Sequence, residues 1–125
     1  GSRPFSEPET RALRDLVLDL KSKSSRLYVI VLHSSVRRST GEVYPANNDS
    51  LDIARVYANA TGYNIQYAWD QYVTSGEAIT WCGEQGIAAL DIVIPANQEP
   101  YTKVSGSTSL LGITVQALQS LSEYR

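Results

Sequence analysis

Apolar residues recur every three or four positions in four segments of the chain, and this spacing predicts four helices. The first helix is predicted over residues 7–22, where Ser6 and Glu9 have the spacing of a capping box. The apolar side of this helix is formed by Leu13, Leu16, Val17 and Leu20. The other predicted helices are residues 48–62, ended by Gly62, residues 76–86, ended by Gly86, and residues 110–124, with Leu111, Val115, Leu118 and Leu121 on the apolar side.

Continuous apolar runs predict the strands. Residues 27–33 are rich in β-branched and aromatic side chains, which predicts a strand buried on both faces. Residues 87–94 have the same character apart from Asp91, and residues 65–69 are a shorter candidate strand. The polar segments 34–48 and 95–107 are predicted loops. Because helices alternate with strands, the expected fold class is a three-layer α/β/α arrangement with a small, mostly parallel sheet.

Length and composition exclude several kinds of function. The chain has 125 residues, enough for one domain with a core. A net charge of −2 and a pI near 5.3 argue against a nucleic-acid partner. The pair Arg37-Arg38 is expected in a solvated loop, and no apolar run approaches the roughly 18 residues of a membrane span. We expect Gly1-Ser2 to be a cloning remnant, which leaves residues 3–125 as a single domain.

The only histidine, His33, ends the predicted strand over residues 27–33. Ligands of open parallel sheets bind beyond the carboxyl ends of the strands. A long loop of the kind that carries function follows His33. The alternative is structural, with the imidazole bonded to a neighbouring backbone group, and lone histidines more often have that role. A single cysteine allows no internal disulfide and no zinc site of four cysteines or of two cysteines and two histidines.

Three stretches favour a functional role of His33 over a structural one: "PFSEPETRALRDLVLDLK", "YVIVLHSSV" and "YVTSGEAITWCGEQGIAALDIVIP". In order and spacing they resemble the C-terminal half of the zinc metallocarboxypeptidases, the carboxypeptidase A-like family. The murein-peptide amidase and gamma-D-glutamyl-diaminopimelate peptidase branch is the most similar. The resemblance covers nearly the whole chain. It implies half of a zinc carboxypeptidase-like (phosphorylase/hydrolase-like) fold, zinc as the cofactor of the intact domain, and peptides or cell-wall peptides as ligands.

The resemblance also assigns roles to single residues. It implies that His33 is the family's third zinc ligand, whose His-x-x-Glu partners are absent from this sequence, as is the Asn-Arg pair that binds the substrate carboxylate. Tyr72 resembles the tyrosine that closes over the substrate, and Trp81 follows at a matching distance, although Tyr72 is equally expected to cover a core edge. Val93 stands at the position of the general-base glutamate and cannot accept a proton. Asp91 lies on the same side of the strand, where pairing with a neighbouring donor is the favoured role.

Three further residues are weaker candidates. Glu77 is expected at a helix start, where a negative charge favours the helix dipole. Glu84 is expected to be solvated. Cys82 is expected to be a small buried apolar residue, because no base lies near it in the sequence.

The sequence therefore predicts a truncated, non-catalytic zinc carboxypeptidase-like domain that binds zinc weakly or not at all. Two alternatives stay open. In the first, the chain is a fragment of an active zinc-dependent carboxypeptidase or cell-wall peptide amidase whose other zinc ligands lie in a missing N-terminal half. In the second, it is a protein-interaction subunit. Since both long strands have the composition of central strands, the expected partner is that missing half or a second copy joined through an exposed sheet edge.

Overall fold

The computed structural model describes residues 2–34, 38–67, 76–96 and 109–124. The helices and strands follow in the order α1 (Pro8–Lys23), β1 (Tyr28–Ser34), β2 (Glu42–Pro45), the 3₁₀ turn η1 (Asn48–Ser50), α2 (Leu51–Thr61), β3 (Asn64–Ile65), α3 (Ala78–Glu84), β4 (Ala88–Ile94) and α4 (Leu110–Glu123). The four predicted helices are confirmed with small shifts at their ends. No helix among these residues is long and apolar enough to span a membrane.

The described strands form one sheet in the order β1-β4-β2-β3. β1 pairs with β4 in parallel, β2 pairs with β3 in parallel, and β2 joins β4 in antiparallel orientation. The predicted α/β class is confirmed. The prediction of a loop over residues 34–48 is wrong at Glu42–Pro45, which form β2. A strand of four residues that follows a glycine and ends in a proline is too short for its alternation to be recognised.

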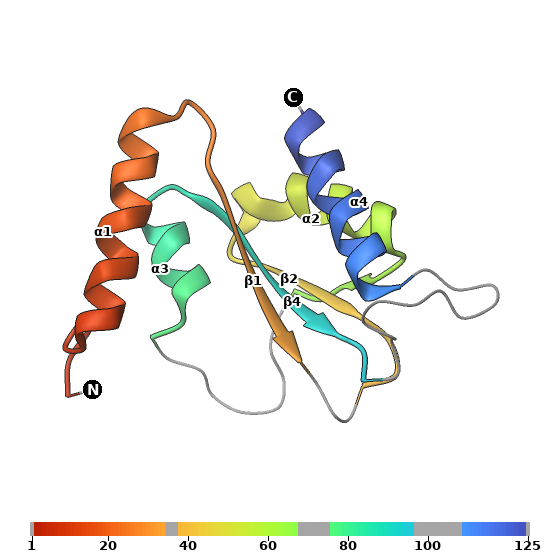
Figure 1. The fold of residues 1–125 in the computed structure, drawn as a ribbon, viewed down its shortest axis with the longest axis horizontal. Coiled ribbons are helices and arrows are strands. Elements are labelled where there is room, and N and C mark those ends of the chain that lie inside the picture. Colours follow the sequence, from red (N-terminus) through yellow and green to blue (C-terminus); the bar gives the residue numbers. More distant parts are fainter. Residues whose placement is uncertain (1, 35–37, 68–75, 97–108, 125) are drawn as a thin grey trace.

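Helices cover both faces of the sheet (Figure 1). On one face, α1 and α3 pack over the sheet through the buried residues Val17, Ile79, Cys82, Ile87 and Ala89. On the other face, α2 and α4 pack over it through a larger cluster: Val43, Ile53, Ala54, Tyr57, Tyr63, Leu90, Ile92, Ala117 and Leu121. The expected three layers are therefore present, with β4 buried at the centre.

The start of α1 differs from the prediction. The helix begins at Pro8, whose missing N–H suits the first helical position. Glu7 is therefore the N-cap and no side chain caps the helix. The capping box expected from Ser6 and Glu9 does not form, because the Ser6 hydroxyl donates to the Glu7 carboxylate at 2.9 Å.

The ends of α2 and α3 follow the glycine signals. Gly62 caps the C-terminus of α2 with a φ of 75°. Gly86 follows α3 with a φ of 70°. Both angles lie in the left-handed region, which glycine enters at little cost. At the other end of α2, the buried Ser50 hydroxyl accepts a hydrogen bond from the Ala89 N–H of β4, so this turn is tied to the central strand.

The prediction that β1 is buried on both faces is wrong. β1 is an edge strand, paired with β4 on one side. Its last three residues, Leu32, His33 and Ser34, are exposed. β4 has nearly the same composition and is paired on both sides. The composition of β1 suits a central strand, but among the described residues β1 has a neighbouring strand on one side only.

Candidate functional site

His33 and Asp91 lie at one end of the sheet. β1 and β4 are parallel, so their carboxyl ends meet there, and β2 begins at the same end. In the register, His33 lies opposite Val93 and Asp91 lies opposite Val31. Side chains alternate between the faces of a strand, so all four point to the face covered by α1 and α3. The diagonal contact brings His33 Nε2 to 3.0 Å from Asp91 Oδ1.

The two partners differ in exposure. The His33 side chain is 51% exposed and the Asp91 side chain 17% exposed. Asp91 was expected to pair with a donor at the sheet, and that donor is His33 itself. The contact therefore joins an accessible imidazole to a carboxylate anchored in the central strand.

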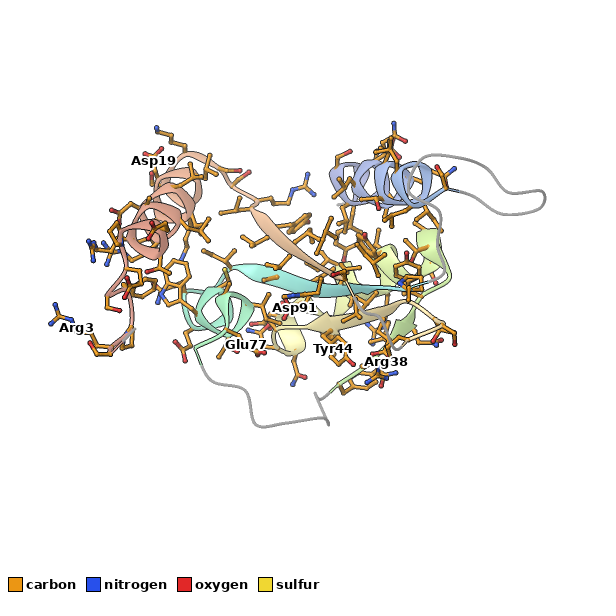
Figure 2. The ribbon with its side chains drawn as sticks, turned by 60° about the horizontal axis from the view of Figure 1, so that its bottom comes forward. Arg3, Asp19, Arg38, Tyr44, Glu77 and Asp91 are labelled. Atoms are coloured by element: carbon orange, nitrogen blue, oxygen red, sulfur yellow. The ribbon has the colours of Figure 1, made fainter. Side chains whose placement is uncertain are left out.

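A second polar group lies on the same face of the sheet. Glu42 is 3% exposed, although it carries a carboxylate. The Arg38 guanidinium donates to Glu42 Oε1 at 2.5 Å, and the Tyr44 hydroxyl donates to Glu42 Oε2. Glu42 is the register partner of Val93, and Tyr44 is the register partner of Asp91. Polar side chains of β1, β4 and β2 thus share one face of the sheet, with Val93 between His33 and Glu42. Figure 2 shows Asp91 and Tyr44, which are register partners on β4 and β2.

The sequence prediction missed this second group because its residues fell in a predicted loop. Arg38 was expected in a solvated loop; it lies outside the helices and strands, but it is only partly exposed and pairs with a buried carboxylate. Arg37 lies outside the described residues. The alternation of Glu42, Val43 and Tyr44 is the one signal of a strand here, with Val43 buried on the opposite face.

The other candidate residues have the following places. Tyr72 lies outside the described residues. Val93 is 6% exposed and lies beside His33. Cys82 is buried as expected, and burial raises the pKa of its thiol, with the charge of Asp91 adding to the shift. Glu77 is the N-cap residue of α3, without a side-chain cap hydrogen bond. Glu84 is exposed, as expected.

The described residues fit only one part of a zinc site. A catalytic zinc ion needs three protein ligands. Among residues 2–34, 38–67, 76–96 and 109–124, no three histidine, cysteine, aspartate or glutamate side chains are grouped closely enough to hold a metal ion. His33 lies at the carboxyl end of β1, and its imidazole is a side chain of a kind that binds zinc. We therefore derive no catalytic step through zinc from these residues.

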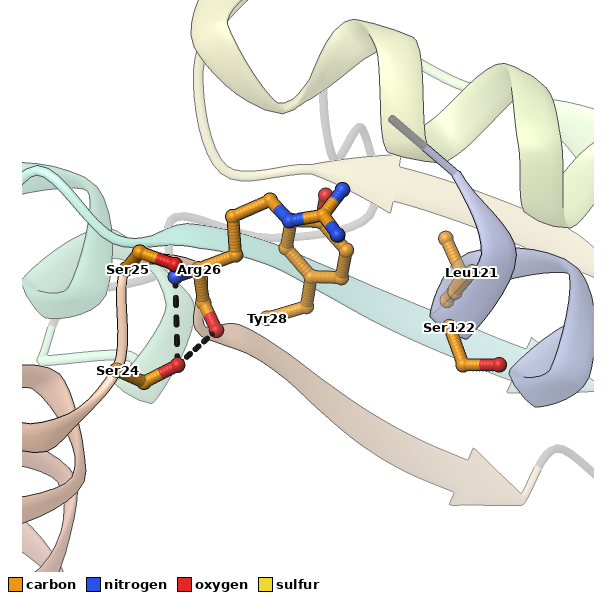
Figure 3. Close-up of a pocket in the computed structure, with 6 residues that line it drawn as sticks. All are labelled: Ser24, Ser25, Arg26, Tyr28, Leu121 and Ser122. Carbon is orange, nitrogen blue, oxygen red and sulfur yellow. Dashed lines mark hydrogen bonds between the residues drawn. The ribbon is translucent and has the colours of Figure 1, made fainter.

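A cavity of about 260 Å³ lies at the other end of β1. It is lined by Ser24, Ser25, Arg26, Tyr28, Leu121 and Ser122 (Figure 3). The Ser24 hydroxyl donates to the Arg26 carbonyl, and the Arg26 guanidinium donates to the Tyr124 carbonyl at the end of α4. The contact of Arg26 with Tyr124 holds the end of α4 against the segment that leads into β1. The cavity contains no candidate acid, base or metal ligand among its lining residues.

No protein-family model matches the chain, and no curated protein matches its sequence. A solved structure that does match is the murein-tripeptide amidase MpaA from Escherichia coli O157, with a TM-score of 0.63 and 20% sequence identity. The match covers 96% of this chain and 44% of the MpaA chain, so the chain spans less than half the length of that neighbour. The chain therefore has a partial carboxypeptidase-like α/β fold, with a small sheet of four described strands.

Proposed function

We propose that this chain is one half of a zinc carboxypeptidase-like domain, that it supplies His33 as a single zinc ligand, and that it does not hydrolyse peptides by itself. The fold shared with 44% of the MpaA chain supports the proposal. The position of His33 at the carboxyl end of β1 supports it as well, because ligands of such sheets bind there. Among the described residues no three possible metal ligands are grouped, and we propose that the remaining ligands come from further polypeptide.

The observation that carries the proposal is the edge strand β1 together with exposed apolar residues of the two helices that flank it, a set that we name the β1 surface. It comprises the free backbone edge of β1 with Leu32, the stripe Leu13, Leu16 and Leu20 on α1, and the stripe Leu111, Val115 and Leu118 on α4, all of these side chains being exposed. Figure 1 shows β1 running between α1 and α4. Apolar residues exposed at helical spacing on two helices beside an unpaired strand edge are typical of a surface that another segment covers.

Further polypeptide of a carboxypeptidase-like domain suits the β1 surface. The MpaA chain is more than twice as long as its matching part, so a fold of this kind includes at least as much structure again. A strand added beside β1 would satisfy its free backbone groups and approach the end where His33 lies. In the absence of that half, we expect a second copy of this chain to pair along β1. The name of MpaA suggests peptides or cell-wall peptides as ligands of the completed domain.

Light scattering on the isolated chain at micromolar concentration tests the proposed surface. We expect dimers or larger species, and we expect the variants Leu16→Glu and Leu118→Glu to shift the chain toward monomer, because each places a charge in the apolar contact. Tyr67→Glu is the control, since Tyr67 is exposed and follows β3 at the other side of the sheet. A wild-type chain that stays strictly monomeric and melts cooperatively would overturn this part of the proposal.

A peptidase assay tests the catalytic part. We expect the isolated chain to release no C-terminal residue from peptides and to cleave no murein peptide, with or without added Zn²⁺. Zinc-dependent release that is abolished by His33→Ala would contradict the proposal.

A further inference from the structure

We infer that Asp91 is a positioning residue for His33: its carboxylate accepts the Nε2–H hydrogen bond, and the imidazole therefore offers Nδ1 to a ligand. The inference rests on the proposed function only in the choice of Zn²⁺ as the probe. It concerns the orientation of the one histidine in the chain and requires no activity.

The burial of the two side chains decides which one positions the other. Asp91 belongs to β4, the buried central strand, and its side chain is 17% exposed. His33 belongs to the edge strand β1, and its side chain is 51% exposed. A side chain enclosed by packed neighbours has few rotamers, whereas an exposed imidazole at a strand edge has more. The contact therefore restricts His33, and Asp91 is its fixed point.

The neighbours of His33 leave Asp91 as the residue able to hold it. The side chains on the same face beside it in the register are Val31, Val93 and Asp91. The side chains of the two valines have no group that forms a hydrogen bond. Within the part of the chain that the structure describes, Asp91 is the one side chain that hydrogen-bonds to the imidazole.

The chemistry of the pair assigns the proton. An ionised carboxylate only accepts hydrogen bonds, and a neutral imidazole has one N–H and one lone pair. The 3.0 Å contact between Nε2 and Asp91 Oδ1 thus requires the hydrogen on Nε2. The lone pair is then on Nδ1. Histidines that bind metals commonly donate their other N–H to a carboxylate, which sets the tautomer and the ring orientation.

Nitrogen NMR of the histidine-labelled chain tests the inference directly. Because His33 is the only histidine, the spectrum contains one pair of ring-nitrogen signals. In buffer alkaline enough to keep a free imidazole neutral, we expect Nε2 to give the signal of a protonated nitrogen and Nδ1 that of an unprotonated one. On titration with Zn²⁺ alone, we expect the Nδ1 signal to move. A wild-type chain in which Zn²⁺ moves the Nε2 signal would overturn the inference.

Three variants complete the experiment. In Asp91→Ala we expect Zn²⁺ to reach Nε2 as well and the Kd for Zn²⁺ to rise by roughly tenfold. Asp91→Leu, whose side chain has a similar shape and accepts no hydrogen bond, should show the same trend if the alanine variant fails to fold. Glu84→Gln is the control, because it removes a carboxylate from an exposed position of α3. Unchanged nitrogen signals and an unchanged Kd in both Asp91 variants would also overturn the inference. Either failure leaves the β1 surface and its association test unaffected.

Discussion

Val93 and His33 are register partners on the parallel strands β4 and β1, with both side chains on the same face of the sheet. On its other side, Val93 is the register partner of Glu42 on β2. The position at which the resemblance expects a general base thus lies beside a histidine and a buried carboxylate, and it is occupied by a valine that is 6% exposed.

Replacing this valine by a carboxylate should destabilise the chain. We expect Val93→Glu to lower the free energy of unfolding by roughly 1–3 kcal/mol, because a carboxylate loses hydration there and lies near the carboxylates of Glu42 and Asp91. Val93→Gln, which adds similar volume without charge, should cost less. Urea unfolding of the two variants measures the difference. An unchanged or raised stability of Val93→Glu would show that the position is open to solvent. We expect neither variant to gain peptidase activity.

Glu42 should contribute to stability through its two donors. We expect Glu42→Ala to cost about 3 kcal/mol, because it removes the carboxylate that accepts a hydrogen bond from Arg38 and another from Tyr44 and leaves a cavity in its place. Glu42→Gln should cost less, since an amide oxygen still accepts one of the two bonds. The control is Glu84→Gln, an exposed change expected within about 0.5 kcal/mol of the wild type. Chemical unfolding that gives equal values for Glu42→Ala and Glu84→Gln would contradict the pairing.

Tyr63 should make the stability fall at high pH. Burial raises the pKa of its hydroxyl to about 12, and Tyr57 adds to the shift. In the unfolded chain a tyrosine ionises near pH 10. As the pH rises, the hydroxyl of Tyr63 therefore ionises first in the unfolded state. The stability that the neutral, buried Tyr63 contributes is fully present below about pH 10 and is lost between about pH 10 and 12. The loss is at most roughly 2–3 kcal/mol.

The variant Tyr63→Phe tests this assignment. Its thermal midpoint should fall less steeply between about pH 10 and 12 than that of the wild type. Part of the slope should remain, because burial also raises the pKa of Tyr57. Tyr67→Phe is the control, since Tyr67 is 74% exposed. Equal slopes for the wild type and Tyr63→Phe would rule out Tyr63 as the source.

The elements with strong local signals were predictable. α2 was recognised from its apolar spacing, and the turn at Gly62 from the glycine itself. β2 was not, because four residues are too short to show a period. The edge position of β1 was also beyond the sequence pattern, since composition describes what a strand can bury and not which neighbours are present. That position leaves an edge which the proposed partner would cover.

The candidate site was also predictable only in part from the sequence. His33 could be selected from its place at the end of an apolar run. Its contact with Asp91 could not, because it depends on the register of two strands 58 residues apart in the chain. Likewise, the ring of Phe5 lies 5.5 Å from that of Trp81, centroid to centroid. Both residues belong to stretches that carry the family resemblance, and only the fold brings them together.

Calorimetric titration of the isolated chain with Zn²⁺ tests the central claim, that this polypeptide holds one ligand of a zinc site and not a complete site. We expect weak binding that His33→Ala removes, far below the roughly 10–16 kcal/mol of complete structural zinc sites. One tight site per chain, with zinc held by His33 and other residues of the same chain, would contradict the account.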